Sequence, residues 1–365
     1  MSYTPGLLVT PSTRHRVRRL LPIPGDVLVE VGQSVAATEV VARTARPGEV
    51  DPVNLKSRLG VAPADVPRCL LKEVGQSVAA GEVVARSPGL WGFFRREYAA
   101  ERPGTIESVS RITGQMILRG PEQAIELPAY LSGHVVEVVP GQGCVIEAAA
   151  AVVQGIFGIG GEAHGPLRMA ATDPGQTLRS VPADSRGQVL VGGARVTIEA
   201  IREAIAYGAA AIIAGGIDDA DLKDLLGYDL GVAITGTETI GLTLVITEGF
   251  GEIAMAARTF ELLGSLAGRE ASVNGTTQIR AGVLRPEVLV PVDGDSAPPR
   301  PAAALAVGVP VRIIRDPHFG TLGQVAALPP EPAMLESQSR ARVLVVDTAA
   351  GPLTVPRANV ELIET

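Results

Sequence analysis

The sequence predicts a multidomain protein of the α/β plus β class, with an N-terminal β domain, a central α/β domain with a mostly parallel sheet, and a small C-terminal β barrel. A fourteen-residue stretch of β character occurs twice near the N-terminus, strand and helix patterns alternate in the middle, and short β runs return after a proline-rich linker. At 365 residues the chain is longer than one ordinary domain. The expected boundaries are 1–160, 161–291, 292–304 for the linker, and 305–365.

An internal repeat organises the N-terminal region. Residues 30–43 return 43 residues later as residues 73–86, with 13 of 14 positions identical. Near-identity predicts the same turn and strand in both copies, and we expect both copies within one β domain. Gly32 and Gly75 lie where the turn needs a positive φ angle, which glycine adopts at little cost.

Two further stretches, residues 104–114 and 133–143, share the pattern Gly-x-[Val/Ile]-x-x-[Val/Ile] followed by a glycine turn. Together with the repeat, this pattern resembles the barrel-sandwich hybrid scaffold of biotinyl and lipoyl carrier domains, efflux-pump adaptors and RNA polymerase large subunits. The resemblance implies a rigid β scaffold. Carrier domains present their modified lysine within Met-Lys or Asp-Lys-Ala, and neither pair occurs in this chain. Neither biotin nor lipoate is therefore expected on Lys56 or Lys72.

An aromatic cluster follows the second copy of the repeat. Trp91, Phe93 and Phe94 stand beside two arginines. Aromatic residues flanked by arginine suit a surface that binds a protein partner. The same residues equally suit a plug for one end of a small barrel, so both interpretations stay open.

Strand and helix patterns alternate in the central region. Apolar strands are expected over residues 188–193, 210–217, 231–238 and 242–251, and helices over 197–208, 218–227 and 252–266. Continuous apolar strands with helical crossovers imply a parallel sheet that is covered on both faces.

The carboxyl ends of these strands are the expected ligand site, because such sheets bind ligands there. Glycine lets the backbone approach a phosphate, and threonine hydroxyls and helix N-terminal amides donate hydrogen bonds to it. The candidate ligand-binding residues are Thr235, Gly236, Thr237, Glu238, Thr247, Glu248, Gly249, Gly251 and Arg280. Glu238 and Glu248 are also candidate metal ligands, with Mg²⁺ expected only beside an anionic ligand. Alternatively, each glycine only ends its strand and each glutamate caps a helix.

Catalytic chemistry has little support in the sequence. The four histidines lie far apart, and none belongs to a known hydrolase or metalloprotease motif. His164, in a glycine-rich stretch with Glu162 nearby, is the weak candidate for acid–base work. Whether the protein is an enzyme therefore stays undecided.

The C-terminal region carries its own motif. Gly308, Gly320 and residues 323–325 stand where the KOW motif has its glycines and its Gly-x-Val strand start, and the match continues to Ile363. This region resembles the SH3-like barrel of transcription elongation factors and a ribosomal protein, which implies contact with RNA, a polymerase or another protein. From Leu305 onward there are five arginines against six carboxylates, so protein contact is favoured. The candidate local patch consists of Arg312, Arg315, His318 and Phe319.

Composition limits the class of protein further. A net charge of −7 argues against non-specific coating of nucleic acid. Two cysteines make no disulfide framework or metal-ligand set, which favours the cytoplasm. No apolar stretch approaches the roughly 18 residues of a membrane span, so no membrane contact is expected.

Three functions stay open after these observations. The favoured one is a non-catalytic, multidomain adaptor that contacts a protein partner through its β domains. The second is binding, with or without turnover, of a nucleotide or phosphorylated metabolite at the α/β strand ends. The third is a transcription- or translation-associated factor that contacts RNA through the C-terminal barrel, which the acidic balance disfavours.

Overall fold

The structure, a computed structural model, describes residues 7–89, 95–228, 238, 240–277, 284–293, 305–313, 318, 321–334 and 340–362. Within these residues the chain forms 28 strands and only four α-helices, so the protein is mostly β with several separate sheets. No helix in the described part of the chain is long and apolar enough to cross a membrane.

The largest sheet has twelve strands and joins the N-terminal region to the central region. Its strands are β1 (Val9–Leu20), β3 (Ser34–Val35), β12 (Gly133–Val139), β13 (Gly143–Gln154), β14 (Phe157–Ile159), β15 (Glu162–Met169), β16 (Val189–Val191), β17 (Arg195–Val196), β18 (Ala211–Ile217), β19 (Thr243–Phe250), β20 (Glu270–Asn274) and β21 (Glu287–Pro291). Their order is β14-β19-β18-β16-β15-β20-β21-β13-β12-β3, with β1 also paired to β13 and β17 to β18. The first half of β13 pairs with β12 and the second half with β21. The expected domain boundary at residue 160 therefore falls inside one continuous sheet.

The central part of this sheet is parallel, as the alternating sequence pattern predicts. Strands β15, β16, β18 and β19 run parallel, and antiparallel strands flank them on both sides. Helices α2 (Ile198–Tyr207) and α3 (Asp219–Leu226) pack on Leu190 and Ile212, whereas α4 (Ala257–Ser265) packs on Val189 and Ile213. Because successive side chains in a strand point to opposite faces, these helices cover both faces of the sheet.

Part of the N-terminal region forms what we call the proximal module, residues 20–46 and 123–147. It contains β2 (Asp26–Val27), β4 (Val40–Arg46) and β11 (Gln123–Pro128) in a three-stranded sheet, together with β3, β12 and the first half of β13. Its core is small and apolar, and includes Val35, Val41 and Ile146.

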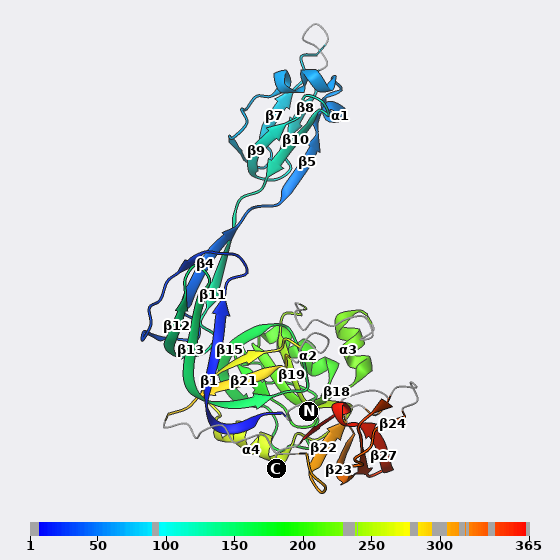
Figure 1. The fold of residues 1–365 in the computed structure, drawn as a ribbon. Coiled ribbons are helices and arrows are strands. Elements are labelled where there is room, and N and C mark those ends of the chain that lie inside the picture. The colour runs from blue at the N-terminus through cyan, green and yellow to red at the C-terminus, as the bar shows by residue number, and fades with distance from the viewer. Residues whose placement is uncertain are drawn as a thin grey trace.

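The residues between β4 and β11 form a second unit, the distal module (residues 50–119). Its elements are β5 (Val50–Asn54), α1 (Leu55–Leu59), a 3₁₀ helix (Pro63–Cys69), β6 (Ser77–Val78), β7 (Val83–Arg86), β8 (Glu97–Ala99), β9 (Gly104–Val109) and β10 (Gln115–Arg119). Every buried residue of its core lies between Val53 and Leu118. In Figure 1 the distal module stands away from the rest of the molecule, at the end of the extended segments that leave β4 and β11.

The two modules share one backbone plan, and each contains one copy of the sequence repeat. Gly32 and Gly75 have φ angles of 87° and 93°, and their N–H groups donate to Val135 and Ile106 at 2.7 Å in both cases. Strand β3 pairs with Gly133 as β6 pairs with Gly104. The expectation of equal local geometry is thus confirmed.

The correspondence extends to irregularities in the ladders. A bulge between Val135 and Glu137 in β12 has its equivalent in the β9–β10 ladder, where Ile106 pairs with Leu118 and Ser108 with Ile117. The β4–β11 and β7–β8 ladders also share a register shift, one between Leu127 and Pro128 and the other between Val83 and Ala85. The expectation that both copies lie in one β domain is wrong, because each copy packs into its own core.

The C-terminal region forms a five-stranded antiparallel sheet. Its strands are β22 (Pro310–Ile313), β23 (Leu322–Ala327), β26 (Val343–Thr348), β27 (Gly351–Pro356) and β28 (Val360–Leu362), and a separate pair is made by β24 (Ala333–Met334) and β25 (Arg340–Ala341). The order β27-β26-β23-β22-β28 brings the last strand beside the first. Between the described strands no pairing joins β27 to β28, so the expected closed barrel is not seen there.

Candidate functional site

The strand-end ligand site is described in part. Thr235, Gly236, Thr237 and Arg280 lie outside the described residues. Of the other candidates, Glu238 is half-buried, and the rest belong to β19 and the turn that follows it. No group of three or more His, Cys, Asp or Glu side chains in the described ranges is arranged to hold a metal ion.

Backbone packing occupies the described strand ends. A Cβ atom at Gly216 would collide with the carbonyl oxygen of Gly251, and one at Gly215 would collide with the carbonyl oxygen of Ile253. The turn after β19 therefore lies directly against the end of β18. Gly215 and Gly216 therefore serve close backbone packing, whereas a ligand-binding role of Gly249 and Gly251 stays a prediction.

Thr247 and Glu248 are used inside the protein. The Thr247 hydroxyl donates to the carbonyl oxygen of Ala214 at 3.3 Å. The Glu248 carboxylate accepts a hydrogen bond from the Ala256 N–H at 3.1 Å and forms an ion pair with Arg312. The carboxylate of Glu248 is therefore already neutralised by the guanidinium of Arg312, which disfavours a cation there.

Arg312, which the sequence placed in a local surface patch, is buried in the structure. Its side chain is 4% exposed, and besides Glu248 it donates to the carbonyl oxygen of Thr247 at 3.2 Å. Arg312 belongs to β22, so this buried pair attaches the C-terminal sheet to the end of β19. Arg315 and Phe319 lie outside the described residues, as do Trp91, Phe93 and Phe94, and His318 is half-buried.

His164 has a different partner from the one expected. It lies on β15, and its Nδ1 is 3.5 Å from Oε2 of Glu270, whose side chain is 60% exposed. Glu162 instead pairs with Arg19. His164 therefore contacts one carboxylate, and no second catalytic group lies beside it among the described residues.

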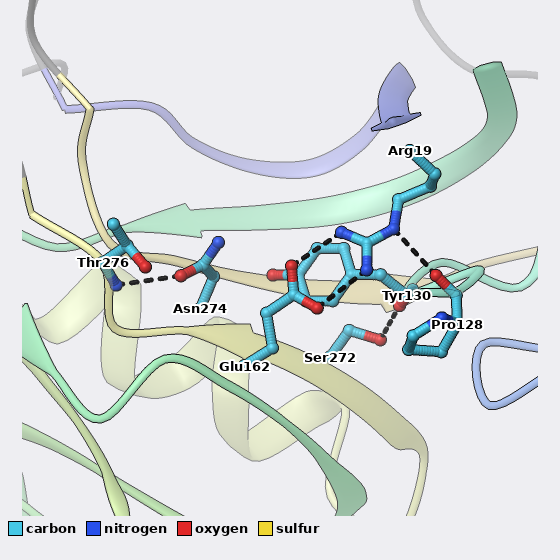
Figure 2. A network of polar contacts seen from close by, with 7 residues as sticks. All are labelled: Arg19, Pro128, Tyr130, Glu162, Ser272, Asn274 and Thr276. Carbon is cyan, nitrogen blue, oxygen red and sulfur yellow. Dashed lines mark hydrogen bonds and ion pairs between the residues drawn. The ribbon is translucent and has the colours of Figure 1, made fainter. Parts of the chain in front are cut away.

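A second polar cluster, which the sequence did not predict, lies between β1, β15 and β21. We call it the Tyr130 network, and it consists of Arg19, Glu162, Tyr130, Glu287 and His15 (Figure 2 shows the first three). Arg19 donates to both carboxylate oxygens of Glu162, at 2.6 and 2.9 Å. This bidentate geometry is the strong form of an arginine–carboxylate contact.

Arg19 also fixes the segment that follows β11. Its Nε donates to the carbonyl oxygen of Pro128 at 2.8 Å, and its guanidinium carbon lies 5.4 Å from the centre of the Tyr130 ring. The Ser272 hydroxyl donates to the carbonyl oxygen of Tyr130. One buried arginine therefore holds β1, the end of β11 with the segment after it, and β15 together.

Tyr130 is unusual in its backbone and in its hydroxyl. It has a φ angle of 68°, the one positive φ among the non-glycine residues that the structure describes. The residue is 5% exposed, and its hydroxyl makes no hydrogen bond to any described residue. Burial raises the pKa of this phenol well above its ordinary value, and the charges of Glu287 and Glu162 add to the increase.

Glu287 is the second carboxylate of the network. Burial and, to a lesser degree, the charge of Glu162 raise the pKa of Glu287 from 4.5 to about 7. Nε2 of His15 lies 3.8 Å from Oε2 of Glu287, but burial lowers the pKa of His15, so its imidazole is neutral near pH 7. Perturbed carboxylates of this kind are concentrated at functional sites.

The sequence contained one signal that pointed to this network. Charged and polar residues occupy inward positions of strands whose other inward residues are apolar, as in Glu287 beside Leu289 on β21. The members are spread along the chain from residue 15 to residue 287, and the sequence of β1 shows only an arginine-rich segment. Pairing between distant strands, which local patterns do not specify, brings them together.

Comparison of the chain with protein-family models finds no match, and comparison with curated proteins finds none either.

Proposed function

We propose that the protein is a non-catalytic, multidomain adaptor that contacts a protein partner through its two β modules. The observation that carries this proposal is an exposed apolar pair that recurs at equivalent places. Leu28 and Val31 precede and enter the first turn, and Leu71 and Val74 occupy the same positions 43 residues later. Their exposed fractions are 44% and 65% in the proximal module and 52% and 54% in the distal module.

A structural role does not account for these side chains. Each module has its own core, and neither pair belongs to it. Most other residues kept between the copies have a local task; for example, Gln33 and Gln76 each accept a hydrogen bond from a backbone N–H three residues earlier, at 3.1 and 3.0 Å. Exposed apolar side chains at a repeated position are typical of a surface that binds protein.

The arrangement of the modules suits a partner with a repeated or extended surface. Figure 1 places the modules one after the other along the long axis of the molecule. Two weak contacts presented by one chain gain overall affinity when a partner engages both at once. The described strand ends are packed against backbone, and Arg312 is buried in an ion pair with Glu248. Neither feature gives comparable support to a ligand-binding or RNA-contacting function.

Affinity capture with matched variants tests the proposal. The wild type is compared with Leu28→Ser/Val31→Ser, with Leu71→Ser/Val74→Ser, and with all four changes combined, using host lysate with and without nuclease. We expect the same partner to be reduced in each double variant, reduced further in the combined variant, and retained after nuclease treatment. Leu322→Ser/Met334→Ser, which changes exposed apolar residues of the C-terminal region, is the control and should leave capture unchanged. Equal capture by the wild type and the combined variant would contradict the proposal, and loss on nuclease treatment would favour an RNA-mediated contact.

A further inference from the structure

One end of the Tyr130 network is acidic, because it contains the carboxylates of Glu162 and Glu287. The proposed adaptor function does not use this acidic end. Glu162 and Glu287 approach each other across β20, because Glu162 pairs with Asn274 in one ladder and Asn274 pairs with Glu287 in the next. Their side chains are 36% and 20% exposed, so both side chains lie partly at the surface. Beside them lies the hydroxyl of Tyr130, which is deeply buried and makes no hydrogen bond to a described residue.

Figure 2 shows the direction of this hydroxyl. The ring of Tyr130 lies against the guanidinium of Arg19, and its hydroxyl end points toward the Glu162 carboxylate. A buried hydroxyl without a hydrogen-bond partner destabilises the folded protein. A ligand that supplies hydrogen bonds at this position would remove this destabilisation.

The charges of the network determine which charge such a ligand should carry. When ionised, Glu162 and Glu287 contribute two negative charges, and Arg19 neutralises one of them through its bidentate contact with Glu162. His15, the basic group that the described part of the chain places against Glu287, is neutral near pH 7 because burial lowers its pKa. One negative charge therefore stays uncompensated, which favours a ligand with one positive charge.

The number of hydrogen-bond acceptors in the network narrows the choice of ligand. A carboxylate offers about four lone-pair positions, so Glu162 can accept a further bond beyond the two from Arg19, and Glu287 and the Tyr130 oxygen are also acceptors. A primary ammonium has three N–H donors, one for each of these groups. We propose that the acidic end of the Tyr130 network is a binding site for a primary ammonium group, supplied by a small amine or by a lysine side chain of another protein.

The site has a built-in dependence on pH. Because the pKa of Glu287 is about 7, most of this carboxyl is protonated at pH 6 and most is ionised at pH 8. Ammonium binding needs the ionised form, so affinity should rise by about tenfold between these values. Tyr130 keeps its proton over this range, since burial raises the pKa of the phenol further.

Isothermal titration calorimetry of the full chain at constant ionic strength tests the proposal. Propylammonium is the first probe, Nα-acetyl-lysine amide the second, and tetramethylammonium and Mg²⁺ are the comparison cations. We expect both amines to bind at pH 8 and about tenfold more weakly at pH 6. Tighter binding of the lysine derivative would identify a protein lysine as the source, and tighter binding of propylammonium a small amine.

Variants separate the site from general charge attraction. Glu287→Gln should weaken amine binding about tenfold at pH 8 and abolish its pH dependence, because the uncompensated charge is gone. Tyr130→Phe keeps the buried ring and should weaken binding while preserving the pH dependence. Glu270→Gln, a carboxylate of the same strand β20 that pairs with His164, should bind as the wild type does. Equal binding of tetramethylammonium, tighter binding of Mg²⁺, or wild-type affinity in Tyr130→Phe and Glu287→Gln would each overturn the proposal.

Discussion

At the scale of single residues, two buried arginines hold the large pieces of this molecule together. Arg19 connects β1 with β15 and with the end of β11, and Arg312 connects the C-terminal sheet with β19. Both are buried with a carboxylate partner, which is the condition under which a buried charge is tolerated. Arginine composition was visible in the sequence, but the partners were not, because Glu162 and Glu248 come from strands far away in the chain. The candidate residues of the central region could therefore be named, while their actual contacts could not.

Glu287 gives the residue-scale prediction. Its pKa is about 7 in the folded protein and 4.5 ordinarily, so the folded state binds the proton more tightly than the unfolded state. The stability that this proton contributes is fully present below pH 4.5 and is lost as pH rises through 7, by about 3 kcal/mol in total. We expect Glu287→Gln to unfold at the wild-type temperature near pH 4.5 and at a higher temperature than the wild type at pH 8. Differential scanning calorimetry across this range is the measurement, and parallel curves for the two proteins would refute the shift.

At the scale of elements, the repeat predicted local structure better than it predicted packing. Near-identity of residues 30–43 and 73–86 fixes the turn, the strand and the alternation of buried residues, because these depend on neighbours along the chain. Which core each copy joins depends on β9, β10, β12 and β13, whose pairings are non-local. The alternating pattern of the central region likewise predicted the parallel strands, but not the antiparallel strands that flank them. Local pattern therefore identified the elements, and the ladders assigned them to modules.

The turn glycines give the element-scale prediction. Gly75 has a φ angle of 93°, and a Cβ atom there would meet nothing within 4 Å, so Gly75→Ala should cost only the left-handed conformation, roughly 1–2 kcal/mol. Gly32 has the same open surroundings and is the matched control. Hydrogen exchange should show Gly75→Ala losing protection over residues 97–109 and keeping it over residues 126–139, with the reverse in Gly32→Ala. Joint loss in both modules from either change would show that they unfold as one unit.

At the scale of the whole molecule, the distal module is an insertion in the β4–β11 hairpin of the proximal module. It contains the second copy of the repeat and the proximal module contains the first. Strands β4 and β11 pair as neighbours through Arg46 and Gln123, and the chain between these residues builds a unit with a separate core. The core of the proximal module contains no residue of the distal module. This nesting explains why one domain was expected over residues 1–160: the two halves of the proximal module are separated in the sequence by a unit that resembles them.

Removing the insertion is the prediction at this scale. Replacing residues 47–122 by Asn-Gly joins Arg46 to Gln123 through a two-residue turn of the type that antiparallel hairpins prefer. The shortened chain should keep the calorimetric transitions of the proximal module, the central sheet and the C-terminal sheet, because the distal core contributes no residue to the other clusters. X-ray scattering should show a shorter maximum dimension, since Figure 1 places this module at the far end of the molecule. If the proximal module melts at a lower temperature in the shortened chain, the distal module stabilises it. In that case the apolar pairs proposed to bind a partner would not be independent of each other.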